Sequence, residues 1–147
     1  MRIRPHAIRY LLILVLLVMD RQGALDAQVK HHVPEARVVR LNPASAESLA
    51  VLTGPPMTVS LRSGYMVLAP SLHVGRHTTG IHEEAIVVLA GSGELRIADG
   101  NKIFLSAPCV AYCPPATVHD VFNTGKDTLR YVWIVAPAKE GKQFEEH

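Results

Sequence analysis

Two histidines and one glutamate are the residues of this chain best suited to chemistry. His77 opens the segment HTTGIHEEAIVVLAG, Glu84 lies within it, and His119 lies in the later segment PPATVHDVFN. Each stands on or beside a run of β-type residues. Imidazole and carboxylate groups suit borderline or hard divalent cations, and a set of three leaves coordination positions open. If strands bring the three side chains together, the sequence predicts a metal pocket inside a β-barrel.

Short apolar runs that could position these residues fill most of the chain beyond residue 56. The clearest is a pair of runs around Asp99-Gly100, because Asp-Gly suits the positive φ angles of a tight hairpin turn. No segment has a convincing amphipathic helical pattern. The sequence therefore predicts an all-β domain, a sandwich or barrel of jelly-roll type. The predicted strands are 59–62, 64–68, 85–89, 95–98, 102–105, 111–113, 117–122 and 129–136.

The chain of 147 residues is long enough for about one domain. We expect a signal peptide at 1–27, an N-terminal arm or edge strand at 28–55, the barrel at 56–138 and a flexible tail at 139–147. The formal net charge of +2 comes entirely from residues 1–27, so the remainder is neutral. A neutral domain without a basic stripe gives no reason to expect nucleic-acid binding.

The N-terminal segment has the features of an export signal. Arg2, Arg4 and Arg9 precede an apolar stretch at 10–19, and Ala27 offers a small residue at a plausible cleavage point. Ten apolar residues are too few to span a bilayer, which takes about 20. An uncleaved anchor and a short buried helix are the alternatives. We expect a periplasmic or secreted protein with no stable membrane span after cleavage.

Export would place the two cysteines in an oxidising compartment, where disulfides persist. Cys109 and Cys113 are nevertheless a poor pair if the run between them is extended, since four residues of strand separate Cα atoms by about 13 Å. A disulfide needs less than about 7 Å. We expect free, at least half-buried thiols, although a turn at Pro108 would allow a bridge.

The motifs around the histidines resemble those of the cupins, which are double-stranded β-helix (jelly-roll) barrels. In the first motif His77, Glu84 and Gly91 match, while Ser71 replaces its opening glycine and Thr79 its second histidine. In the second motif the matching residues are Pro114, His119 and Asn123, while Pro108 and Ala116 replace its two glycines. The resemblance covers roughly 57–137. It implies the barrel fold and a homodimer, and it leaves the activity open because cupins serve many functions.

The resemblance also implies a metal site with one ligand missing. Cupins with the full set hold their metal through three histidines and the glutamate, whereas this chain has Thr79 at one histidine position. His82 lies two residues before Glu84, so in an extended strand both point to the same face, and His82 is a candidate substitute ligand. Alternatively His82 lies in the loop before the strand and faces water. The divalent metal is Fe, Mn, Zn, Ni or Cu, and iron(II) is hard to keep reduced outside the cytoplasm.

Three functions fit these residues. The first is a metal-dependent enzyme of dioxygenase or isomerase type acting on a small organic substrate. The second is a non-catalytic module that binds a small ligand in the barrel. The third is a structural cupin with a degenerate site. Arg62, Tyr65 and Tyr112 are candidate polar groups of the pocket, chosen from their positions on the predicted strands.

Overall fold

The computed structural model describes residues 33–138, and these contain eight β-strands and no α-helix. The predicted signal peptide and the predicted tail therefore lie outside the described residues. No helix among residues 33–138 is long and apolar enough to cross a membrane. The strands are β1 (Leu49–Thr53), β2 (Arg62–Leu68), β3 (His82–Ala90), β4 (Ser92–Ile97), β5 (Lys102–Ser106), β6 (Cys109–Cys113), β7 (His119–Phe122) and β8 (Leu129–Pro137).

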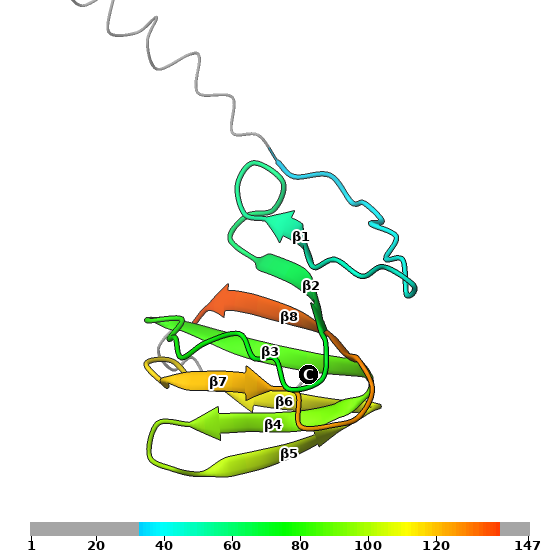
Figure 1. Ribbon diagram of the computed structural model, residues 1–147. Coiled ribbons are helices and arrows are strands. Elements are labelled where there is room, and N and C mark those ends of the chain that lie inside the picture. Colours follow the sequence, from blue (N-terminus) through cyan, green and yellow to red (C-terminus); the bar gives the residue numbers. More distant parts are fainter. Residues whose placement is uncertain (1–32, 139–147) are drawn as a thin grey trace, which may run out of the picture. The chain divides into compact units, whose positions relative to one another are not determined.

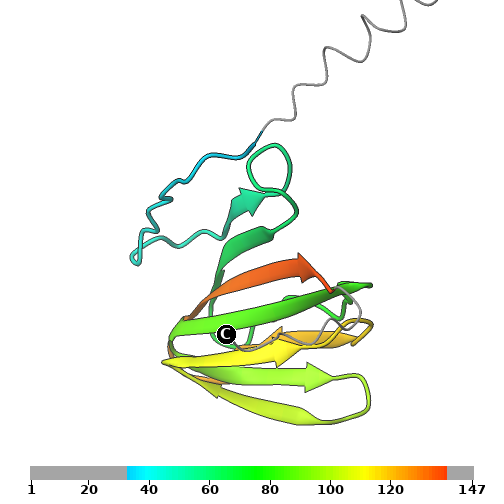
Figure 2. The same cartoon turned by 180° about the vertical axis from the view of Figure 1, so that it is seen from behind.

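The strands form two antiparallel sheets that face each other (Figure 1). The larger sheet has the order β1-β2-β8-β3-β6 and the smaller one the order β5-β4-β7. The segment between β2 and β3 runs beside β7 and bridges it twice, at His73 with Phe122 and at His77 with His119. Figure 2 shows the same layers from behind, with β6 at one edge of the larger sheet. The all-β prediction is confirmed.

The hydrophobic core lies between the two sheets and takes side chains from both. Alternation along each strand sends every second residue inward. On β3, Ile86 and Val88 are buried, and on β8, Leu129 and Tyr131 are buried, while Leu95 of β4 packs against them from the smaller sheet. Burying side chains of this size contributes about 1.5–3 kcal/mol each. This packing fixes the inward faces of β3, β7 and β8, on which the candidate site depends.

Seven of the predicted strands are present, and the prediction at 59–62 is wrong. That segment turns: Met57 and Thr58 both donate their amides to the Gly54 carbonyl, at 2.8 and 3.1 Å, and strand β2 begins only at Arg62. The side chain of Val59 is 79% exposed, so burial does not favour an extended strand at this residue. The edge strand β1 pairs with β2 and leaves 33–48 without regular structure.

Two residues that replace motif glycines keep the left-handed backbone that glycine favours. Ser71 has a φ of 67° and Ala116 a φ of 59°. Each non-glycine residue in this region costs about 1–2 kcal/mol. The motif residue Asn123, by contrast, is fully buried and satisfied: its amide donates to the carbonyls of Leu68 and Asp127, at 2.8 and 2.9 Å. These contacts join the end of β2 to the turn between β7 and β8.

Both cysteines are free, and they lie at the two ends of β6. Cys113 is fully buried and Cys109 is half-buried. Several large apolar side chains on the outer faces of β3, β5 and β6 are exposed. They are Leu89, Ile103, Phe104, Val110 and Tyr112. A homodimer remains a prediction.

Candidate functional site

His77 and His119 are held side by side by a pair of backbone hydrogen bonds. The amide of His77 donates to the carbonyl of His119 at 3.0 Å, and the amide of His119 donates back at 2.9 Å. Their ring centroids are 4.5 Å apart. His119 begins β7 and is 1% exposed, while His77 lies in the segment beside it and is more accessible to solvent. The chain thus presents two imidazoles at one point of the barrel wall.

Glu84 reaches the same point from the opposite sheet. Its side chain is buried, and its Oε2 lies 3.1 Å from Nε2 of His119. One ligand atom from each of His77, Glu84 and His119 lies within 4.8 Å of the others. Ligand atoms bound to one ion at about 2.1 Å lie roughly 3–4 Å apart. The three donors therefore need only a small contraction to hold one ion.

The two rings share an orientation that aims the same nitrogen at this point. Nδ1 of His77 donates to the carbonyl of Gly75 at 2.8 Å, and Nδ1 of His119 donates to the carbonyl of Thr117 at 3.0 Å. Because a carbonyl only accepts, each Nδ1 carries a proton, and Nε2 is the nitrogen left for a ligand. Such an outer contact to Nδ1 is usual for metal-binding histidines and fixes the ring.

Without a metal, His119 favours its charged form. Hydrogen bonds to Cys113 and to Glu84 raise the pKa of His119 to about 10, although burial acts in the opposite direction. The imidazolium has an acceptor at each nitrogen, the Thr117 carbonyl at Nδ1 and the Glu84 carboxylate at Nε2. A metal ion at this point must displace the Nε2 proton, because metals bind the neutral imidazole.

His82 does not join the group. The residue opens β3, and its Nδ1 donates to the carbonyl of Thr79 at 3.1 Å, so the ring is held against the preceding turn. Thr79, at the motif's second histidine position, lines the cavity and donates its hydroxyl to the carbonyl of His82 at 2.7 Å. The structure thus brings together three of the four predicted ligands and leaves the missing imidazole unreplaced.

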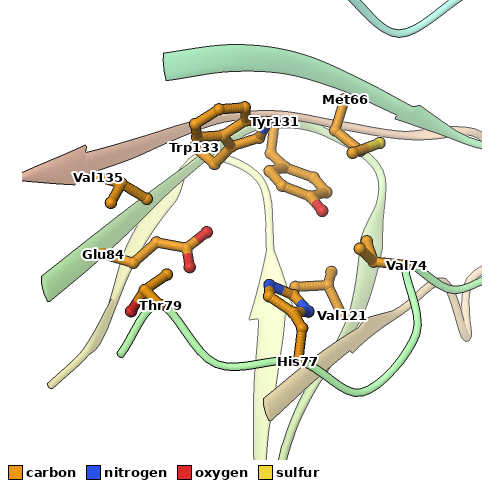
Figure 3. Close-up of a pocket in the computed structure, with 9 residues that line it drawn as sticks. All are labelled: Met66, Val74, His77, Thr79, Glu84, Val121, Tyr131, Trp133 and Val135. Atoms are coloured by element: carbon orange, nitrogen blue, oxygen red, sulfur yellow. The ribbon is translucent and has the colours of Figure 1, made fainter. Parts of the chain in front are cut away.

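A cavity of about 310 Å³ opens beside the three donors. Figure 3 shows that the carboxylate of Glu84, the ring of His77 and the hydroxyl of Tyr131 face one central space. Most of the remaining wall is apolar. The lining residues are Met66, Val74, His77, Thr79, Glu84, Val121, Tyr131, Trp133 and Val135.

The predicted pocket groups Arg62, Tyr65 and Tyr112 are all outside this cavity. Tyr65 is 2% exposed and its hydroxyl accepts a hydrogen bond from Arg130. Tyr112 faces solvent, where its hydroxyl donates to Glu83 at 3.1 Å. On β2 the neighbour of Tyr65 lines the cavity instead, since adjacent strand residues point to opposite faces.

Tyr131 is the polar residue of the wall that the sequence did not single out. Burial and the charges of Glu84 and Asp120 raise the pKa of Tyr131, so its hydroxyl stays protonated and is a hydrogen-bond donor. Next to it, the Trp133 ring lies against Gly64, where a Cβ would stand 2.5 Å from an indole carbon. Gly64 thus allows the indole its place in the wall.

These features define the class of fold: two antiparallel sheets that enclose a His-Glu-His cluster form a double-stranded β-helix barrel. Residues 64–135, just under half of the chain, match the family profile described as the cupin domain (Cupin_2). The barrel is therefore a cupin barrel, as the motif resemblance predicts. No curated protein matches this chain in sequence.

Solved structures with the same fold come from bacteria, an archaeon and a yeast. A Cupin 2 conserved barrel domain protein from Salinispora arenicola is 21% identical, with a TM-score of 0.58 over 71% of this chain and 91% of that one. An uncharacterized conserved protein with a double-stranded β-helix domain from Klebsiella pneumoniae is 23% identical, with a TM-score of 0.59 over 73% and 95%. An RmlC-like cupin family protein from Methanocaldococcus jannaschii is 15% identical, with a TM-score of 0.59 over 69% and 91%. At these identities the likeness establishes the fold.

Proposed function

We propose that this cupin barrel binds one divalent metal ion through Nε2 of His77, the carboxylate of Glu84 and Nε2 of His119. The observation that carries the proposal is the meeting of these three donors within 4.8 Å. The carbonyls of Gly75 and Thr117 hold both rings with Nε2 toward the group, so little reorganisation is needed on binding. Two imidazoles and a carboxylate are a donor set that iron, manganese, zinc, nickel and copper all accept.

Three protein ligands leave coordination positions open on the side of the cavity. An ion held there supplies Lewis-acid or redox chemistry to an oxygen atom of a bound molecule. The protein's own residues select that molecule. Val74, Val121 and Val135 form apolar walls, and Tyr131 offers one hydrogen-bond donor.

The molecule that fits is a small, uncharged organic compound with an oxygen donor at one end. A cavity of about 310 Å³ is at the small end of ligand sites, which span roughly 300–1,000 Å³. No lysine or arginine is among the residues lining it, so an acidic group of the ligand would be buried without a counter-charge. The oxygen end lies at the metal, within reach of Tyr131, and the apolar end lies against Trp133.

Metal content tests the ligand set. The protein is purified without chelators and its metals are measured by elemental analysis beside His77→Ala, His119→Ala and His82→Ala. We expect a stoichiometric metal in the wild type, its loss in the first two variants, and its retention in His82→Ala. Unchanged metal content in His77→Ala or His119→Ala, with correctly folded protein, contradicts the proposed site. Loss of metal from His82→Ala contradicts the three-residue ligand set.

Trp133 provides a direct assay of the cavity because it is the only tryptophan of the chain. We expect catechol to change the fluorescence of the metal-loaded protein and its carboxylated counterpart, 3,4-dihydroxybenzoate, to bind more weakly. Tyr131→Phe removes one hydrogen bond and should lower catechol affinity about two- to tenfold. Equal affinity for the two compounds contradicts the proposed ligand class.

Oxygen uptake and product analysis across a panel of uncharged phenols, enols and ketones separate an enzyme from a binding module. We expect turnover that depends on the metal and is lost in His119→Ala. If metal and ligand bind tightly and no turnover appears, the barrel is a non-catalytic binding module.

A further inference from the structure

The outer face of the smaller sheet carries a second cavity, of about 440 Å³, whose lining includes three basic side chains among apolar ones. Strand β7 alternates between the two sites: His119 and Val121 point into the barrel, while Asp120 and Phe122 line the outer cavity. The other residues around the outer cavity are His73, Arg76, Arg96, Ile97, Ala98, Gly100, Asn101 and Lys102. They come from β4, from the β4–β5 turn, from the start of β5 and from the segment beside β7.

Strand register sets the charged groups in a row. Arg96 of β4 is paired with Lys102 of β5 on one side and with Asp120 of β7 on the other. Arg76 belongs to the segment that runs along the far edge of β7. Three permanently cationic side chains therefore surround a cavity whose lining contains a single carboxylate, that of Asp120.

Both carboxylate oxygens of Asp120 already have hydrogen-bond partners. One oxygen accepts from Nδ1 of His73 at 2.7 Å, and the other accepts from the amide of Gly75 at 2.9 Å. The side chain is only 8% exposed. Asp120 is therefore already hydrogen-bonded at both oxygens, and it faces three cationic side chains in the lining of the cavity.

The guanidinium group of Arg96 is held in place by contacts to Phe122 and Glu94. Its guanidinium carbon lies 3.9 Å from the centroid of the Phe122 ring, and its Nε donates to Glu94 at 2.8 Å. The Nε contact leaves both terminal nitrogens of Arg96 without a partner among the described residues. Lys102 is 3.9 Å from the same glutamate, and Arg76 has no ion pair within residues 33–138. Counting Glu94 and Asp120 against the three cations, the group keeps a net charge of +1.

We propose that this outer cavity is a binding site for a small oxyanion, a phosphate or carboxylate group, held by Arg76 and Arg96 with Lys102 as a further counter-charge. The planar guanidinium donates two parallel hydrogen bonds to such a group, which a lysine does not. Preorganisation of Arg96 on Phe122 reduces the entropy lost on binding. The barrel cavity selects the opposite kind of ligand, because it has no lysine or arginine in its wall.

Backbone-amide NMR shifts of the chelator-treated full chain test this site, with inorganic phosphate and succinate as the two probes. We expect saturable shifts at Gly75 and Asn101, and a loss of affinity of about tenfold in Arg76→Gln. Arg40→Gln is the matched control, since it removes the same charge from an exposed arginine outside the sheets. Saturation by phosphate alone assigns the site to phosphate groups, and saturation by succinate alone assigns it to carboxylates.

Three results overturn the proposal. The first is the absence of saturable shifts with either anion, and the second is an equal loss of affinity in Arg40→Gln and Arg76→Gln. The third is a set of shifts confined to residues of the barrel cavity. None of these outcomes depends on the metal site, because the protein is metal-free, so the two proposals fail independently.

Discussion

Proton release on metal binding is the sharpest test of the His119 environment. With a pKa of about 10, His119 holds its proton almost completely in the metal-free protein at pH 8. A histidine with the ordinary pKa of 6.5 is only about 3% protonated at that pH. Binding a metal at Nε2 must remove the proton, because metals bind the neutral imidazole. We therefore expect about one proton to be released per metal ion at pH 8, against nearly none for an ordinary histidine.

Isothermal titration calorimetry with Mn²⁺ measures this number. The observed enthalpy is compared in two non-coordinating buffers of different ionisation enthalpy, and the difference gives the protons released. The same competition weakens the apparent metal affinity at pH 8 by about 100-fold, and the affinity should rise about tenfold per pH unit between pH 7 and 9. Release of close to zero protons with intact metal binding would refute this account of His119.

Cys113→Ala is the informative variant because it leaves every proposed ligand in place. The hydrogen bond to Cys113 is the largest cause of the raised pKa of His119. Without it we expect fewer protons released at pH 8 and a tighter apparent affinity for Mn²⁺. An unchanged proton count in Cys113→Ala would contradict the assignment of the raised pKa to the Cys113 contact.

Three further predictions concern stability and positioning. The metal-free protein should lose stability as the pH rises from 6.5 to about 10. His119 keeps its proton in the folded protein over this range but loses it in the unfolded chain, so its stabilising effect is complete only below pH 6.5. Urea denaturation across the range measures the loss. Ser71→Gly and Ala116→Gly should each raise the free energy of unfolding by about 1 kcal/mol by relieving a positive φ, and an unchanged urea midpoint would show that the turns carry no strain. Asp120→Ala should weaken metal binding although Asp120 is no ligand, because Asp120 holds Gly75, whose carbonyl orients the ring of His77. Asp120→Asn retains one acceptor for the Gly75 amide and should recover part of the affinity. Equal metal affinity in both variants would contradict this positioning role of Asp120.

The meeting of His77, Glu84 and His119 was predictable because motif spacing and strand alternation act together. Glu84 directly precedes the apolar run 85–89, so it belongs to the strand that this run predicts. His77 and His119 flank strands whose ends are marked by glycine and proline. The sequence does not encode the hydrogen bonds to Gly75 and Thr117 in any visible pattern, and these bonds set the ring orientation.

The prediction for His82 assumed that a residue on the same strand face as Glu84 also reaches the metal cluster. The argument that residues two apart share a face holds only inside a strand. His82 is the first residue of β3, and its ring is hydrogen-bonded to the turn that precedes it. Strand alternation also explains why Tyr65, a candidate pocket group, lies outside the cavity while its neighbour Met66 lines it. An alternating pattern shows that two faces exist, and only packing against β8 decides which one faces the cavity.

His73 shows what local sequence leaves out. Nothing near it predicts a partner, and the pairing with Asp120 joins residues that are 47 positions apart. The contact exists because the segment beside β7 forms backbone bridges with that strand. The path of a loop cannot be read from its sequence, so the partner of a histidine in that loop cannot be predicted. The outer cavity could therefore not be predicted from the sequence.

The two faces of β7 are connected through Gly75. Its amide donates outward to Asp120, and its carbonyl accepts from Nδ1 of His77, which is a proposed metal ligand. A shift of Asp120 therefore moves the residue that orients His77, without contact between the two side chains. Because His73 and Asp120 both line the outer cavity, an anion bound there would lie beside the same hydrogen bonds. Gly75 is thus the backbone link between the outer cavity and the proposed metal site.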